Sequence, residues 1–547
     1  MAPPVFPSAK VTLSYPLYAC DFDPHDANRL VVGGGGGAGR SGVGNKITIL
    51  NSSSPSDLTT AGEIDLSSDE DSVSSLAVSH LKRGKNTLVY AGVNSSPADL
   101  KAGKNEHLRA FAIDSTKARA AGKNVGSAHL SEVSRTALFS ATHPEEYQRL
   151  LRLAPPSASG TQLGVVASGL GKDHQIALFE TSGSSSVPKG KGRLEIEREA
   201  NDVDVIQTGD ESYQVAYCHD YELHVMDVRK GVGAEPRRVY VTPEDVGTGA
   251  PRAAFRAIRY LTPGFVLAVA NLPKRQGVVL QALRLPSNPE DKARVAVYTR
   301  LPKRVAQATA LASQNLSPPT TRGGKIDRAQ YIIAVAGHDS SLSLFTLEHK
   351  SAEGLDMLFD LLPLTTLREV HPLQITGLCF SNFVPPDKGT GVKKQAVKLA
   401  SISMVNTVVV HVIPLRKEVD TSVPVRKNGP PRKARYVVAA KSQRPSSKGL
   451  VMALTLIVVI LAIAGQVVLE VMGRSKPVLG ATRYWNPYGT LRNPDDEFIG
   501  KVMENVPVEP VERVVVGGGH GEEGGAVVGD SGETGEAMGE RGVEDAP

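Results

Sequence analysis

Short runs of β-branched and apolar residues, separated by loops rich in Gly, Ser, Lys and Pro, make up the chain from residue 11 to about residue 415. Such runs are typical of strands, and the longer apolar periods of amphipathic helices are not evident. One apolar strand pattern recurs about every 60 residues. Its seven occurrences lie at residues 46–50, 107–113, 174–179, 221–226, 277–283, 341–345 and 407–412. Several of them follow a second apolar strand and a turn.

A strand–turn–strand unit repeated at a long, regular period is typical of the blades of a β-propeller. One blade is a small sheet that cannot bury both of its faces alone, and radial packing against two neighbours buries them. We therefore predict an all-β fold, a divergent WD40-like seven-bladed β-propeller, over residues 1–415. It is divergent because the period is longer than usual and Trp485 is the only tryptophan. Two packed β-sandwich domains are the alternative.

The composition changes after Pro414. Residues 416–448 carry ten Lys or Arg and only two acidic residues, so we predict a basic linker over residues 416–449. Residues 450–469 follow, without formal charge and rich in Leu, Ile, Val and Ala. At a rise of about 1.5 Å per residue they span roughly 30 Å, the thickness of the hydrocarbon layer. We predict a single transmembrane helix over residues 450–472, because buried helices of soluble proteins are rarely apolar on all faces.

The charges on either side of this helix predict its orientation. The basic linker outweighs the three basic residues that follow the helix, Arg474, Lys476 and Arg483. The positive-inside rule then places the propeller in the cytosol and the C-terminus in a lumen, as in a single-pass type II protein. The lumenal part, residues 473–547, is predicted to be largely disordered, because it is acidic and rich in glycine.

Composition excludes several other functions. The net charge of +5 is small for 547 residues, and the basic linker has no interleaved aromatics, so no nucleic-acid partner is expected. Cys20, Cys218 and Cys379 are far apart and have no metal-type spacing, which fits a reducing compartment. Histidines in the recurring strands, such as His107 and His224, form no ligand set by spacing. No pattern of Ser, His and Asp or of paired carboxylates indicates an enzyme with covalent chemistry.

The candidate functional element is the glycine-rich segment 33–45, GGGGGAGRSGVGN, between strand-like runs at residues 30–32 and 47–50. A loop of this kind can adopt positive φ and bring its backbone close to another group, so its chemistry is mainly that of carbonyl oxygens and amides. Residues 37–42 match GxGxxG, but that motif needs a helix directly after the glycines, and here the strand-like run at residues 47–50 follows. Gly44-Asn45-Lys46 also departs from the P-loop pattern. A low-complexity hairpin tip is the bland alternative.

Three stretches carry a resemblance to a known family. They are residues 15–18 with the segment 30–47, residues 105–111, and residues 371–376 with 400–408. In these stretches and in the order of its features the chain resembles a fungal-type member of the prolactin regulatory element-binding protein family. The members of that family are guanine-nucleotide exchange factors of the endoplasmic reticulum, and they start COPII vesicle coats. The chain end, Glu-Asp-Ala-Pro, lacks the retrieval tetrapeptide of some fungal members.

The resemblance implies a GTPase regulator, not an enzyme of covalent chemistry, whose partner is the small GTPase of the COPII coat. It implies an endoplasmic-reticulum membrane location, with the Golgi membrane as an additional one. It also implies a K⁺ ion held by backbone carbonyls, for which the candidates are Gly36, Gly37, Ala38, Gly39, Ser41, Gly42 and Val43. Asn45 is the candidate for the side chain that displaces the contacts of the nucleotide, with partner contacts at Gly42, Val43, Gly44 and Lys46. A non-catalytic, membrane-anchored propeller scaffold is the alternative.

Overall fold

The computed structural model describes residues 6–39, 41–114, 128–140, 145–244, 252–318, 326–352, 354–386, 395–419, 434–439, 447–476 and 478–480. The chain divides into two units, Met1–Pro445 and Ser446–Pro547, and each is described by itself. The predicted lumenal disorder falls almost wholly on residues 481–547, which lie outside the described residues.

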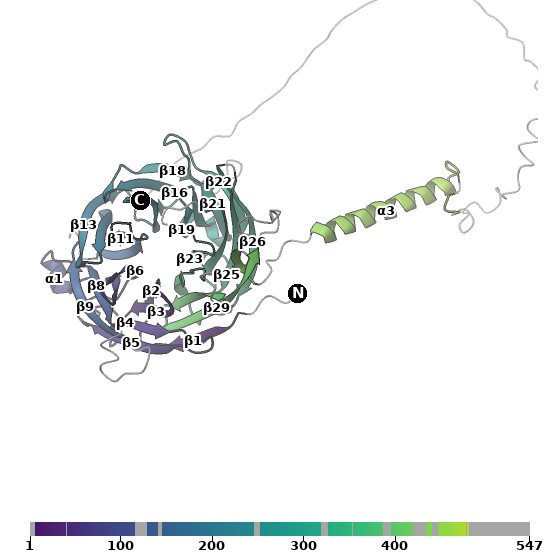
Figure 1. Cartoon of the computed structure of the whole chain (residues 1–547). Coiled ribbons are helices and arrows are strands. Elements are labelled where there is room, and N and C mark those ends of the chain that lie inside the picture. The colour runs from purple at the N-terminus through teal and green to yellow at the C-terminus, as the bar shows by residue number, and fades with distance from the viewer. Residues whose placement is uncertain are drawn as a thin grey trace, which may run out of the picture. The chain divides into compact units, whose positions relative to one another are not determined.

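The first unit is a ring of seven antiparallel sheets that follow one another in chain order (Figure 1). Blade 1 contains β2 (Leu17–Asp23), β3 (Asp26–Gly34), β4 (Asn45–Asn51) and β5 (Thr59–Leu66). Blade 2 contains β6 (Ser75–Arg83), β7 (Asn86–Gly92), β8 (Leu108–Asp114) and β9 (His129–Thr136), with α1 (Pro97–Lys101) between β7 and β8. Blade 3 contains β10 (Tyr147–Leu153), β11 (Thr161–Gly169), β12 (His174–Ser182) and β13 (Ser185–Ile196).

The remaining blades repeat this order. Blade 4 contains β14 (Asp202–Gly209), β15 (Ser212–His219) and β16 (Glu222–Arg229), with β17 (Val232–Gly233) and β18 (Arg237–Val241) both paired to β16. Blade 5 contains β19 (Ala254–Thr262), β20 (Phe265–Asn271), β21 (Val278–Arg284) and β22 (Arg294–Arg300), with the 3-10 helix η1 (Pro273–Arg275). Blade 6 contains β23 (Ala308–Asn315), β24 (Arg328–Gly337), β25 (Leu342–Ala352) and β26 (Leu355–Leu367).

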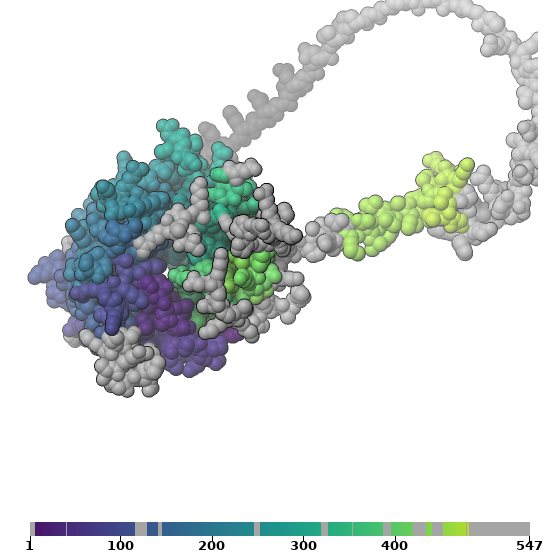
Figure 2. Space-filling view, in the orientation of Figure 1, coloured from purple at the N-terminus to yellow at the C-terminus, as the bar shows by residue number. Residues whose placement is uncertain are grey.

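Blade 7 closes the ring. It contains β27 (Ile375–Phe380), β28 (Gln395–Ser403) and β29 (Thr407–Val419), and its outer strand is β1 (Ser8–Thr12) from the N-terminal end of the chain. β1 pairs with β29 in antiparallel register from Ser8↔His411 to Thr12↔Thr407. The last blade therefore depends on both ends of the propeller sequence. In Figure 2 the purple first blade lies beside the green last blade.

The hydrophobic core is divided among the blade interfaces. Seven clusters of buried apolar residues occur, and each combines residues from two neighbouring blades. The cluster between blades 7 and 1, for example, joins Leu17 and Val32 of blade 1 to Val408 and Val410 of blade 7. This distribution confirms the predicted seven-bladed propeller, because each sheet buries its two faces only against its neighbours. The sandwich alternative is wrong.

Two cysteines that are distant in sequence meet where the ring closes. Cys20 lies on β2 of blade 1 and Cys379 on β27 of blade 7, and their Sγ atoms are 3.5 Å apart. Both are free thiols, as is the buried Cys218. Burial raises the pKa of the Cys379 thiol, first by desolvation and then through the neighbouring Cys20.

The predicted linker begins too early. β29 continues to Val419, and β30 (Ala434–Val438) adds to it as a further strand of the blade 7 sheet. Arg435 forms an ion pair with Glu418, and Val438 is buried in the core between blades 6 and 7. The boundary at residue 415 is therefore wrong. The apolar residues after Arg435 lie within a basic, proline-rich region, and that composition indicates a linker and not a strand.

His107, directly before β8, is buried and uses both ring nitrogens in hydrogen bonds. Its Nε2 accepts hydrogen bonds from the backbone N–H groups of Leu138 (3.1 Å) and Phe139 (3.2 Å), so its Nδ1–H donates to Gln148 Oε1 (2.8 Å). Burial lowers the pKa of His107 to about 4, because desolvation disfavours the charged imidazolium and outweighs the hydrogen bond to Gln148, which raises it. His224 Nε2 lies 3.0 Å from Glu222 Oε2, and His219 lies beside this pair in a group that the spacing of the strand histidines did not indicate.

This histidine predicts a pH dependence of stability. The pKa of His107 is below its ordinary value of 6.5, so the unfolded chain binds the proton more tightly. The stabilisation is complete above pH 6.5 and is lost as the pH falls towards 4, by up to about 3 kcal/mol. We expect the unfolding midpoint in urea to fall over this range, and His107→Gln to reduce that slope. His129→Gln, at an exposed position of β9, is the matched control and should leave the slope unchanged.

The second unit contains α3 (Ser447–Val471). Among the described residues it is the one helix long and apolar enough to cross a membrane, at Met452–Val471. Near its end, Glu470 Oε1 accepts hydrogen bonds from the backbone N–H groups of Val478 (2.6 Å) and Leu479 (2.7 Å). The predicted span of 450–472 thus coincides with a continuous helix.

Candidate functional site

The glycine-rich loop connects β3 to β4 in blade 1, the second and third strands of that sheet (Figure 1). It is shorter than the sequence suggests. Gly33 and Gly34 belong to β3 and pair with Ile47 and Lys46, and Asn45 is already the first residue of β4. The irregular part is therefore residues 35–44. Because β4 begins directly at Asn45, no helix follows the glycines, and both nucleotide-binding motifs lack the element that holds a phosphate.

Gly34 is needed for packing. A Cβ at this position would lie 1.8 Å from the carbonyl oxygen of Pro16, which accepts a hydrogen bond from the N–H of Gly35 (3.0 Å). The start of the loop is therefore pressed against the segment that leads into β2. The run of glycines thus combines two tasks that sequence inspection cannot separate, close strand packing and loop conformation.

We expect Gly34→Ala to destabilise the propeller, by about 2 kcal/mol or more, because strand backbone must shift to make room for the methyl group. Gly39→Ala is the matched control, since a Cβ on Gly39 would meet no atom within 4 Å. Thermal unfolding of the two purified variants measures the difference. Equal midpoints for both variants would contradict the packing role of Gly34.

Within the loop, the Ser41 hydroxyl and the Val43 carbonyl oxygen lie close to Gly36. A Cβ on Gly36 would lie 2.1 Å from the hydroxyl oxygen of Ser41 and 2.8 Å from the carbonyl oxygen of Val43. Gly37 has φ +71°, a conformation that favours glycine. The loop therefore folds back on itself, with oxygen atoms against a backbone that carries no side chain. Hydroxyl and carbonyl oxygens are ligand types that a weakly hydrated monovalent cation accepts.

The other candidates lie further out. Gly39 and Gly42 are exposed and have open space around them, while Ala38 is half-buried. Val43 is half-buried and packs against the core between blades 7 and 1. Lys46 is held within its own sheet, with its Nζ 2.7 Å from Glu63 Oε1 and 2.9 Å from Asp65 Oδ1. These two carboxylates raise the pKa of Lys46. Of the four predicted partner contacts, Gly42 and Gly44 are the most accessible.

Asn45 holds the loop to the neighbouring blade. Its side chain is fully buried, and its Oδ1 accepts a hydrogen bond from the N–H of Gly37 (2.9 Å). Its Nδ2 donates to the carbonyl oxygens of Ser67 (3.1 Å) and Glu70 (2.8 Å), in the connection between blades 1 and 2. The amide thus uses both donors and its acceptor. In this conformation Asn45 sets the position of the loop and presents no atom to a partner.

Behind Asn45 lies a buried ion-pair network that sequence analysis did not predict. Arg109 of β8 is completely buried, and its Nη1 lies 2.6 Å from Glu70 Oε2. Arg135 of β9 binds the other carboxylate oxygen at 2.7 Å and also pairs with Glu132 at 2.6 Å. Burial would raise the pKa of Glu70, but the two arginines outweigh it and lower the pKa. No short-range pattern signals this network, because its members are 39 and 65 residues apart.

An apolar group of exposed side chains, Leu373, Met404 and Val405, was also missed. They are 54%, 45% and 36% exposed, in blade 7. Their turn is tied to the loop through the segment before β2. Leu13 and Asn406 exchange hydrogen bonds of 2.9 and 2.7 Å, and this segment continues to Pro16, which binds Gly35. We refer to these three residues as the blade 7 apolar group. In the sequence, the only sign of this group is that apolar residues occur where a turn is expected.

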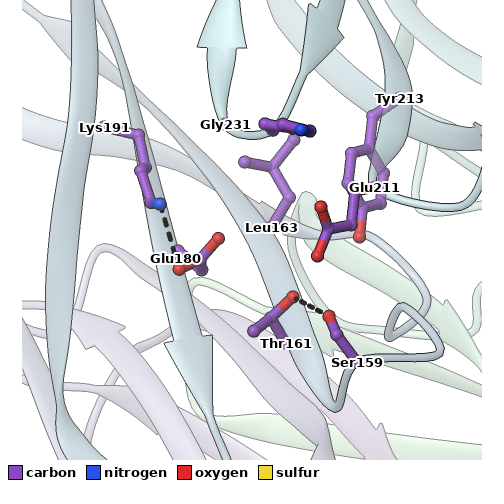
Figure 3. Close-up of a pocket in the computed structure, with 9 residues that line it drawn as sticks. Ser159, Thr161, Leu163, Glu180, Lys191, Glu211, Tyr213 and Gly231 are labelled. Atoms are coloured by element: carbon purple, nitrogen blue, oxygen red, sulfur yellow. Dashed lines mark hydrogen bonds and ion pairs between the residues drawn. The ribbon is translucent and has the colours of Figure 1, made fainter.

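The cavity in Figure 3 lies elsewhere. It has a volume of about 270 Å³ and is lined by strands of blades 3 and 4, including Leu163 and Tyr213. Polar groups in its lining contact one another. Lys191 Nζ lies 3.1 Å from Glu180 Oε1, and Ser159 Oγ lies 3.1 Å from Thr161 Oγ1. Because its lining does not include the glycine-rich loop or the residues behind it, this cavity is separate from the candidate site.

Comparison with known proteins shows similarity over part of the chain. No family model matches the chain. A stretch of 161 residues is 30% identical to the guanine nucleotide-exchange factor SEC12 of Candida glabrata, and it covers 28% of this chain and 30% of that protein. Among solved structures, Sqt1 of Saccharomyces cerevisiae is similar with a TM-score of 0.43 and 11% identity, over 74% of this chain and 98% of Sqt1. Sqt1 of Chaetomium thermophilum has a TM-score of 0.43 and 14% identity, with 74% and 99% coverage.

Proposed function

We propose that this chain is a guanine-nucleotide exchange factor for the small GTPase that initiates COPII vesicle formation, anchored in the endoplasmic-reticulum membrane by α3. The proposal is supported by the partial identity to SEC12 and by the presence of a membrane-length helix after a seven-bladed propeller. The observation that carries it is the built loop of blade 1. Its position is set by the buried Asn45 amide, and an arginine–glutamate network supports it from blade 2.

The chemistry of exchange requires a rigid element. An exchange factor accelerates GDP release only if it binds the nucleotide-free GTPase better than the loaded one. A loop that is ordered before binding loses less conformational entropy when it presses on the nucleotide-binding segments of the GTPase. Asn45 and the close packing at Gly34 give the loop this order at its two ends. The exposed Gly42 and Gly44 would then offer backbone N–H and C=O groups to the GTPase.

A potassium ion is part of this proposal. The hydroxyl of Ser41 and the carbonyl of Val43, which face the bare backbone of Gly36, would be among its ligands. The charge of the ion, when bound, would hold these oxygens together and stiffen the outer part of the loop. Asn45 and Gly37 fix the inner part through their hydrogen bond, so the two devices act on different segments of the same loop.

The blade 7 apolar group would widen the contact. Leu373, Met404 and Val405 are exposed in blade 7, which packs against blade 1, and an apolar surface of the GTPase could be buried there. The propeller would face the cytosol, where the GTPase is found, since the residues before α3 carry the basic excess. Location at the endoplasmic reticulum, with the Golgi membrane as an additional site, belongs to the same proposal.

Release of fluorescent GDP from the purified COPII GTPase tests the proposal. The full chain in detergent micelles, at a tenth of the GTPase concentration, should accelerate release and turn over repeatedly. A membrane-anchored scaffold would bind the GTPase without changing the release rate. That outcome, with a GTPase that exchanges normally in the presence of EDTA, would favour the scaffold.

A further inference from the structure

A second group of ligand-type side chains lies on blade 4, three blades away from the glycine-rich loop. The hairpin between β15 and β16 pairs His219 with Glu222, and Tyr217 with His224. Because side chains alternate along a strand, these four residues lie on one face of the sheet. The hairpin joins the second strand of its blade to the third, as the glycine-rich loop does in blade 1. In a propeller such connections lie at the same end of the ring.

The distances in this group fit a metal ion. His224 Nε2 lies 3.0 Å from Glu222 Oε2, and His219 Nε2 lies 4.0 Å from the same oxygen. One ligand atom from each of the three residues falls within 4.8 Å of the other two. Tetrahedral Zn²⁺ with ligand bonds near 2.0–2.1 Å places its ligand atoms roughly 3.4 Å apart. Side-chain movements of less than about 1 Å would bring the three atoms to that spacing.

The two histidine side chains pack against each other and against Tyr217. His219 is 7% exposed, and its Nδ1 has no hydrogen-bond partner within the described part of the chain. The rings of His219 and His224 are stacked with centroids 5.0 Å apart, and His224 also stacks on Tyr217 at 4.9 Å.

The surroundings orient the carboxylate. Arg238 Nη1 donates to Glu222 Oε1 at 2.7 Å and leaves Oε2 directed at the two histidines. Outer-shell hydrogen bonds of this kind fix ligand carboxylates in metal sites. The acidic Glu197 and Asp220 also face His219, together with Arg198, which pairs with Asp220. The side chain of Glu222 is 25% exposed, so an ion can enter from solvent.

We propose that His219, Glu222 and His224 form a binding site for a divalent transition-metal ion, with Zn²⁺ as the best match. Two imidazole nitrogens and one carboxylate oxygen are ligands that Zn²⁺ prefers, and three protein ligands leave a fourth position for water or a partner side chain. The ion would fasten the β15–β16 hairpin at the end of the ring that also bears the glycine-rich loop. The site does not depend on the proposed exchange function, and its test uses a separate readout.

Calorimetric titration with ZnCl₂ tests the site. The full chain, without a histidine tag and after removal of metal with EDTA, is measured in detergent micelles. We expect one equivalent of Zn²⁺ to bind, and His224→Gln and Glu222→Gln each to weaken binding by about 100-fold or more, since even outer-shell changes weaken metal sites by about 10–100-fold. His338→Gln is the matched control, because His338 is half-buried in the equivalent turn of blade 6. It should bind Zn²⁺ as the unmodified chain does.

Thermal unfolding provides a second measurement if a variant folds poorly. Saturating Zn²⁺ should raise the unfolding temperature of the unmodified chain and of His338→Gln, because a ligand that binds only the folded state stabilises it. The rise should be absent in His224→Gln. Undetectable binding to the unmodified chain, equal affinity in the ligand variants, or loss of binding in His338→Gln would overturn the proposal.

Discussion

Asn45→Ala should reduce the acceleration of GDP release by about 100-fold and leave the propeller folded. The substitution removes three hydrogen bonds at once, the one from Gly37 N–H and the two to the carbonyls of Ser67 and Glu70. The loop then loses its connection to the segment between blades 1 and 2. A displacement of about 1 Å in a positioned group can lower a rate by about 10²-fold. GDP release from the COPII GTPase, with circular dichroism and thermal unfolding as checks of the fold, measures the effect.

Asn51→Ala is the matched control for this variant. Asn51 lies at the opposite end of the same strand, and its Oδ1 accepts only a local hydrogen bond from Ser53 N–H (3.0 Å). Its replacement should leave exchange unchanged. If Asn45→Ala exchanged as fast as Asn51→Ala while both were folded, the loop would not need its hydrogen bonds to Asn45, and the proposed role of this residue would be wrong.

Arg109→Met should produce the largest loss of stability, about 3–5 kcal/mol. Arg109 is completely buried and is bound at 2.6 Å to Glu70. Removal of one partner from a buried ion pair leaves the other charge with less compensation, and this destabilises strongly. Glu70 would keep only Arg135. Because the main-chain carbonyl of Glu70 also holds Asn45, we expect exchange to fall in this variant as well.

Arg135→Met tests whether the loss of stability in Arg109→Met depends on the burial of the arginine. Arg135 binds the same carboxylate at 2.7 Å, but its side chain is 39% exposed. Exposed ion pairs contribute about 0–1 kcal/mol, so this variant should lose far less stability than Arg109→Met. Urea unfolding of both variants provides the comparison. A loss for Arg135→Met equal to or greater than that for Arg109→Met would contradict the importance of the buried pair.

The number of blades could be read from the sequence because each blade repeats the same apolar strand at a regular distance. The membrane-length helix was equally visible, because its apolar residues are contiguous. The outer strand β1 and the added strand β30 were less visible. β30 is five residues long and lies in a basic region, and nothing in its sequence indicates that it pairs with β29. Such strands are specified by pairing and burial, which composition does not record.

Within the candidate site, the sequence indicated the loop but not what holds it. The run of glycines at 33–37 could be recognised, yet Gly33 and Gly34 turned out to pack inside β3. The supports of the loop, Ser67, Glu70 and Arg109, come from residues 22 to 64 positions after Asn45, so no local spacing connects them. The same reason hid the contact of Cys20 with Cys379, which the closure of the ring brings together.

The group on blade 4 was missed for a different reason. His219, Glu222 and His224 are close in sequence, but the spacing of the histidines in the recurring strands does not connect them. The hairpin register places His219 opposite Glu222, and strand alternation returns His224 to the same face. The group is therefore visible only once the register of the hairpin is known.

The most direct test of the central claim is GDP release from the COPII GTPase with the full chain in detergent micelles, measured in potassium buffer and then in sodium buffer. Our account predicts strong acceleration in potassium that drops in sodium, because the loop oxygens of Ser41 and Val43 would hold the larger ion better. Equal acceleration in both buffers would contradict the ion-stiffened loop. No acceleration in either buffer, with a folded propeller and a competent GTPase, would contradict the exchange function itself.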